Sequence, residues 1–137
     1  MVEGDRLEID LVAPGASVLG FERRARSPDE QARVQDVERW FGAPASWLKP
    51  TPGARCRLDR ADVDVSAFEP GEAVRAGHAD LVASYAFHCA DVGRLDMLEV
   101  GLFPRFPALE RVRAEVVTDR GQGSEVLTSA RPTLRLP

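Results

Sequence analysis

HADLVASYAFHC, residues 78 to 89, is the stretch that decides the fold, because apolar residues alternate in it with small or polar ones. Its apolar odd positions are Leu81, Ala83, Tyr85, Phe87 and Cys89. Side chains of a β-strand point alternately to its two faces, so the pattern predicts a long strand with its odd face against a core. The even face is mixed and carries both histidines of the chain, His78 and His88.

The same alternation recurs along most of the chain and predicts further strands. Turn residues separate them at short intervals, which favours hairpin connections and therefore antiparallel pairing. In the segment 54–66 the apolar parity changes near Asp59 and Arg60, so we expect a bulge or a tight turn there. In total we expect about seven strands, at residues 6–12, 54–66, 78–89, 95–102, 111–118, 124–128 and 133–137.

One main helix is predicted near residues 28–41. Ser27 is a good N-cap, Pro28 suits the first helical position, and Glu30 completes a capping box. The apolar residues Ala32, Val34, Val37 and Phe41 follow at helical spacing, and Gly42 ends the pattern. These elements predict an α+β fold, a mostly antiparallel, sandwich-like β-structure with one helix, as a single domain over 1–137.

Composition excludes several classes of function. The chain has 137 residues and a net charge of −4, which gives no basic surface for nucleic acid. No apolar run reaches the roughly 20 residues that a membrane-spanning helix needs, so membrane insertion is not expected. The residues before Arg6 have turn chemistry, and we expect a signal peptide and a first hairpin strand upstream of Met1.

Two cysteines, Cys56 and Cys89, both fall on the apolar side of their predicted strands. They form either a disulfide or two buried thiols, and we favour the disulfide because they are a pair with no third cysteine left over. A disulfide implies an oxidising compartment. Cysteine catalysis is not expected, because His88 neighbours Cys89 and must point to the opposite face of the strand.

The histidines are candidate metal ligands. His78 and Asp80 lie two residues apart on one face of the strand, whereas His88 is ten residues and about 33 Å from His78. Zinc ligands lie about 2 Å from the ion, so one ion cannot take both histidines unless the strand folds back. The alternative is that each histidine is simply solvated or hydrogen-bonded. Ser84, His78 and Asp80 stand in line instead of converging, so we predict no catalytic residue and no enzyme.

Several stretches follow one another in a recognisable order. They are EGDRLEIDLVAPGASVLGFE (3–22), SPDEQ (27–31), GARCRLDRADV (53–63), HADLVASYAFHC (78–89), LFPRFPALERVRAEVVTDRGQG (102–123) and TLRL (133–136). In this order and spacing the chain resembles the ZrgA-type proteins, exported bacterial proteins associated with zinc uptake. The resemblance spans nearly the whole chain. It implies a periplasmic protein, with zinc and a component of a zinc-uptake transporter as its partners.

The departures from that family bear on zinc binding. Such proteins carry a tract rich in His, Asp and Glu before the HAD-like strand, where this chain has no histidine. Arg23 stands where the family tends to have a histidine, and Val82 stands where a second histidine often follows. An arginine cannot bind zinc, because its guanidinium stays protonated. Among the matching residues, His78 and Asp80 remain.

We therefore expect a non-enzymatic periplasmic protein that binds or delivers Zn²⁺ weakly, with His78, Asp80 and His88 as candidate metal ligands. The alternative is a protein-interaction module of the same fold that does not depend on metal. Its expected signature is an exposed apolar patch around Phe103 and Phe106.

Overall fold

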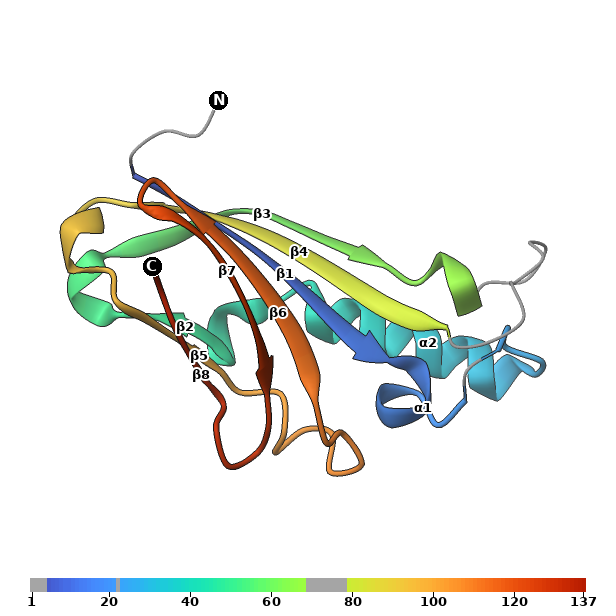
Figure 1. Ribbon diagram of the computed structural model, residues 1–137. Helices are drawn as coiled ribbons and strands as arrows, with labels where there is room; N and C mark the ends of the chain where they lie inside the picture. Colours follow the sequence, from blue (N-terminus) through green and yellow to red (C-terminus); the bar gives the residue numbers. More distant parts are fainter. Residues whose placement is uncertain (1–4, 22, 69–78) are drawn as a thin grey trace.

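The computed structural model describes residues 5–21, 23–68 and 79–137. Its strands form a five-stranded antiparallel sheet of order β3-β4-β1-β6-β7 and a three-stranded sheet of order β2-β5-β8 (Figure 1). The strands are β1 (Arg6–Pro14), β2 (Leu48–Pro50), β3 (Cys56–Asp64), β4 (Asp80–Cys89), β5 (Met97–Val100), β6 (Val112–Thr118), β7 (Gly121–Leu127) and β8 (Thr133–Arg135). The helices are α1 (Gly15–Val18) and α2 (Pro28–Phe41). The α+β prediction with one main helix is confirmed.

One strand, β2, was not expected. It holds only Leu48 to Pro50. Three residues are too few to show a period of two, and Pro50 argues against a central strand. In the structure β2 is an edge strand that pairs with β5 alone, so the proline removes no hydrogen bond from the middle of a sheet.

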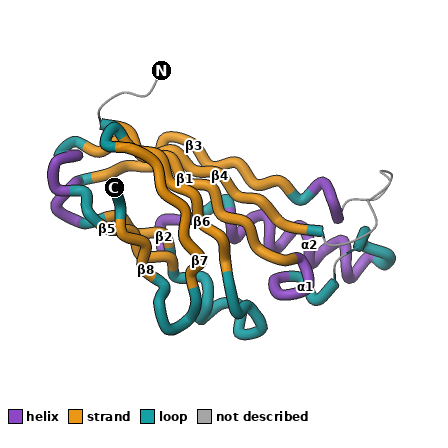
Figure 2. Tube along the Cα trace, viewed as in Figure 1, coloured by secondary structure: helices purple, strands orange, loops and turns teal. Residues whose placement is uncertain are grey.

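Residues 80–89 of HADLVASYAFHC form β4, the second strand of the large sheet. In β4 the odd positions from Leu81 to Cys89 are all buried, as their alternation predicts. Neighbouring β1 buries Leu7, Ile9 and Leu11 on the same side. Figures 1 and 2 show α2 and the small sheet on one side of the large sheet. The core therefore lies between these layers, and the other face of the large sheet carries the polar positions.

Helix α2 begins as its sequence predicts. The Ser27 Oγ accepts from the Glu30 amide at 3.1 Å, and Val34, Val37 and Phe41 form the buried stripe. Ala32, expected on that stripe, is exposed. The Glu30 carboxylate differs from an ordinary capping box, because it accepts from the Arg26 amide at 2.7 Å. The helix ends at Gly42, whose N–H donates to Glu38 O.

An aromatic cluster joins the helix to the sheets. Trp40 stacks on Trp47, Phe41 stacks on Phe106, and Trp47 meets Tyr85 edge-on. The Tyr85 hydroxyl donates to the Phe41 carbonyl at 2.6 Å, which satisfies a carbonyl in the last turn of α2. The cluster and this bond hold the C-terminal end of the helix against β4.

The expected apolar surface patch around Phe103 and Phe106 is absent. Phe103 is 7% and Phe106 4% exposed, so both rings belong to the core. The segment after β5 contains Pro104 and Pro107 and forms turns, and such turns can direct neighbouring side chains inward. Sequence alternation could not show this, because the segment has no regular period.

Strand β3 contains the expected irregularity. Its register against β4 shifts between Leu58 and Arg60, which leaves Asp59 without a partner residue. A bulge of this kind lets two residues of one strand stand opposite one residue of the other. The change of apolar parity near Asp59 and Arg60 is thereby explained.

Candidate functional site

Strand β4 separates the predicted metal ligands. Asp80 is its first residue, is exposed, and stands opposite Pro14 of β1. The chain is held there by a hydrogen bond from the Gly15 amide to the Ala79 carbonyl at 2.9 Å. His78 lies outside the described residues. The structure thus presents the carboxylate of the His78 and Asp80 pair to solvent at the end of the large sheet that lies beside α1.

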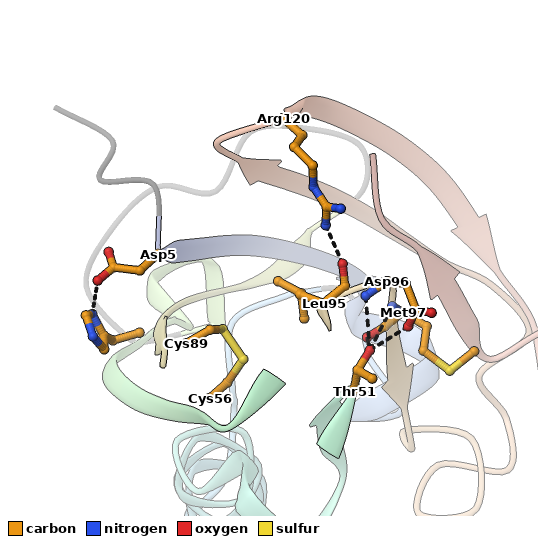
Figure 3. The surroundings of a disulfide bond; sticks show 9 residues. Asp5, Thr51, Cys56, Cys89, Leu95, Asp96, Met97 and Arg120 are labelled. Carbon is orange, nitrogen blue, oxygen red and sulfur yellow. Dashed lines mark hydrogen bonds and ion pairs between the residues drawn. A yellow bond between two sulfur atoms is a disulfide. The ribbon is translucent and has the colours of Figure 1, made fainter. Parts of the chain in front are cut away.

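His88 lies near the other end of β4. Its Nδ1 is 3.1 Å from a carboxylate oxygen of Asp5, and both side chains are about two-fifths exposed (Figure 3). The Cys89 amide also donates to the Asp5 carbonyl at 2.8 Å, so the two chain segments are joined twice. Arg6 and Arg57 occupy the neighbouring positions of the same row on β1 and β3. These two cations oppose the binding of a metal cation beside His88.

Asp80 and His88 do not meet. Eight residues of extended strand separate them, or about 27 Å, so the structure does not bring these two candidate ligands to one ion. Among residues 5–21, 23–68 and 79–137, no group of three or more His, Cys, Asp or Glu side chains could hold a metal ion. A zinc site at Asp80 therefore depends on ligands beyond this described set.

The predicted disulfide between Cys56 and Cys89 is present. The two cysteines are paired residues of β3 and β4, as Figure 3 shows beside the Asp5 contact. Cys89 is fully buried and Cys56 partly buried, and the chain has no free cysteine. The bond closes the end of the sheet that carries His88, so it holds that residue in place.

Sequence reasoning missed a polar cleft on the outer face of the large sheet. The cleft has a volume of about 570 Å³. Its lining residues are Glu8, Asp10, Arg60, Ser84, Tyr85, Glu115, Val116, Val117, Gln122, Gly123 and Ser124. They come from all five strands of the sheet, since Arg60 belongs to β3 and Gln122 to β7.

One cross-strand row forms the middle of this face. It runs through paired residues of the five strands, in the order Asp62, Ser84, Asp10, Glu115 and Ser124. Ser84 therefore lies beside Asp10. Asp10 and Glu115 face each other on adjacent strands, which is unfavourable for like charges. Period-two patterning predicts that each side chain points outward, but only strand order shows which of them are neighbours.

Ion pairs compensate three of the carboxylates on this face. Arg60 lies 3.0 Å from Asp62, and Arg6 lies 3.3 Å from Glu8. Arg113 approaches Glu115 only to 3.9 Å. Asp10 takes part in no ion pair with any residue that the structure describes. The cleft can thus accept hydrogen bonds and attract a positively charged group.

Arg23, which stands where the resemblance leads one to expect a histidine, has a structural partner. Its guanidinium donates two hydrogen bonds to the Glu30 carboxylate, at 2.8 and 2.9 Å. The hydrogen bond from Arg23, followed by the one from the Arg26 amide, lowers the pKa of Glu30 from 4.5 to about 2. Arg23 is therefore bound to the start of α2.

The fold and this surface define a class of protein: an antiparallel β-rich domain braced by a disulfide, with one helix and a polar open sheet face. No helix among the described residues has the length and apolar character needed to cross a membrane. The family model of the ZrgA family zinc uptake proteins matches residues 1–136, so the chain belongs to that family. No curated protein matches the chain.

Proposed function

We propose that this protein is a non-enzymatic, periplasmic component of zinc uptake that binds Zn²⁺ weakly and passes it to a transport component. The observation that carries the proposal is the match to the zinc uptake family over residues 1–136. The disulfide supports an extracytoplasmic location, because such bonds persist in oxidising compartments.

Within this proposal Asp80 and His78 are the zinc ligands. Asp80 supports this assignment because it is exposed at the end of β4 and makes no ion pair with a described residue. A carboxylate and an imidazole are both good zinc ligands, and two of them with water in the remaining positions would bind weakly. His88 is a ligand only for a separate ion, because of its distance from Asp80.

Calorimetric titration with Zn²⁺ tests the assignment. We expect binding in the wild type, its loss in His78→Ala and Asp80→Asn, and unchanged binding in His88→Ala. Binding should weaken below about pH 6.5, because a protonated imidazole cannot bind metal. Absence of heat in the wild type, or equal loss in His88→Ala, would contradict the proposed site.

The second candidate is the metal-independent interaction module. The polar cleft favours it, because this cleft is formed entirely by residues other than His78, Asp80 and His88. On this hypothesis a partner protein binds equally well with and without a chelator. Asp10→Arg should then abolish the binding and Asp80→Asn should not, whereas a chelator-sensitive interaction would favour the zinc function.

A further inference from the structure

The two edge strands of the large sheet, β3 and β7, differ in how well they are protected against pairing with a strand of another chain. In β3, five of the nine residues are charged and a bulge interrupts the register. Both features discourage pairing with another strand. In β7 the only charged residue is Glu125, there is no proline, and pairing with β6 is regular from end to end. Strand β8, which follows β7 in the chain, pairs only with β5. The β7 edge therefore retains the features that favour strand addition.

We propose that two copies of this chain pair antiparallel through β7 and form a dimer with a continuous sheet. A two-fold axis perpendicular to the sheet must place residues of equal parity opposite each other, so it passes midway between one residue of β7 and the same residue of the second copy. An axis is named below by that residue. An axis at Ser124 places Glu125 opposite Gly123 of the second copy. An axis at Glu125 would bring two like charges together, which is unfavourable.

The same axis accounts for an exposed apolar residue. Val126 is 54% exposed, the largest value among the exposed large hydrophobic residues of the described chain. With the axis at Ser124, Val126 lies opposite Gln122 of the second copy, and the methylene groups of that glutamine can cover it. An axis at Gly123 would instead place Val126 opposite Arg120, whose guanidinium is bonded to the Leu95 carbonyl. Of the three axes at Gly123, Ser124 and Glu125, the one at Ser124 is the best match.

The dimer would join the two polar clefts. Gln122, Gly123 and Ser124 of β7 line the cleft, so its β7 wall becomes the centre of the dimer. Because the axis is perpendicular to the sheet, the cleft-bearing faces of both copies lie on the same side of the joined sheet. The joined sheet has about ten strands, a number that open sheets reach. Two paired edge strands form a small interface, so we expect a reversible dimer that dissociates on dilution.

Cross-linking tests the register. Because the chain has no free cysteine, Ser124→Cys introduces a single free thiol. In the proposed dimer this thiol lies opposite the same thiol of the second copy. We expect this variant to form a disulfide-linked dimer under mild oxidation. Gln122→Cys is the matched control on the same strand, since its copies would lie about 13 Å apart. Asp62→Cys is the control on the β3 edge. Equal cross-linking of all three variants would overturn the proposal.

Sedimentation tests the interface without a cysteine. Val126→Lys should abolish the dimer mass, whereas Leu58→Lys, which changes the 39% exposed apolar residue of the β3 edge, should leave it intact. Urea unfolding checks that both variants fold. A monomeric wild type at sub-millimolar concentration would refute the proposal. The experiment is run with a chelator, so its result does not depend on zinc binding.

Discussion

At the scale of single residues, Arg23 and Glu30 illustrate how a charged side chain takes a structural role. Arg23 lies over the Phe21 ring and donates to Glu30, while Glu30 also accepts from the Arg26 amide. The pair connects the loop before α2 to the first turn of the helix. A carboxylate at a helix N-terminus is also favoured by the helix dipole.

The lowered pKa of Glu30 predicts a pH dependence of stability. Its pKa of about 2 in the folded protein lies below its ordinary value of 4.5. The ionised form therefore stabilises the fold above about pH 4.5, and this contribution is lost as the pH falls toward 2. We expect Glu30→Gln to lower the free energy of unfolding at neutral pH and to flatten its acid dependence. Urea unfolding from pH 7 to pH 2, with Glu38→Gln as control, measures this.

The Cys56–Cys89 disulfide should stabilise the folded protein. Its cysteines are separated by 33 residues in sequence, so replacing both with alanine should lower the free energy of unfolding by about 3–4 kcal/mol. A reducing agent should destabilise the wild type by a similar amount and leave the double variant unchanged. A wild type whose unfolding midpoint does not respond to the reductant would contradict this expectation.

Tyr85 gives a third prediction. Its hydroxyl satisfies the Phe41 carbonyl inside the core, and burial raises the pKa of the phenol. Tyr85→Phe keeps the ring but leaves a buried carbonyl without a partner, which should cost about 1–3 kcal/mol. Thermal unfolding of the variant measures the loss. An unchanged transition temperature would mean that water replaces the hydroxyl.

At the scale of elements, α2 depends on its N-cap. Ser27→Ala removes the acceptor for the Glu30 amide and should lower stability by about 1 kcal/mol. Ser46→Ala, in the exposed turn after the helix, is the matched control and should change stability little. Equal losses in the two variants would show that the cap adds nothing specific. Urea midpoints compare them directly.

The strands show what local patterning can and cannot predict. Alternation in β1 and β4 predicted which residues are buried, because each side chain of a strand faces one side by geometry alone. It did not predict β2, which is too short to show a period. It says nothing about the segment around Phe103 and Phe106, where turns direct the rings inward and the apolar patch expected for the alternative function is absent.

At the scale of the whole molecule, the proposed zinc function predicts a gain in stability. A ligand that binds only the folded state stabilises it by about 2.7 kcal/mol at one hundred times its dissociation constant. Saturating Zn²⁺ should therefore raise the unfolding temperature of the wild type, and Asp80→Asn should remove the gain. Mg²⁺ is the control ion. A rise of equal size in both proteins would contradict the role of Asp80.

The sequence by itself determined the fold class, the main helix, the bulge in β3 and the cysteine pair. Each of these follows from local period, capping chemistry or residue count. Only the tertiary structure decided that Asp10 faces Glu115 and that Ser84 belongs to the cleft. The physical reason is that strand order and register set these neighbours, and both arise from long-range pairing that no short stretch encodes.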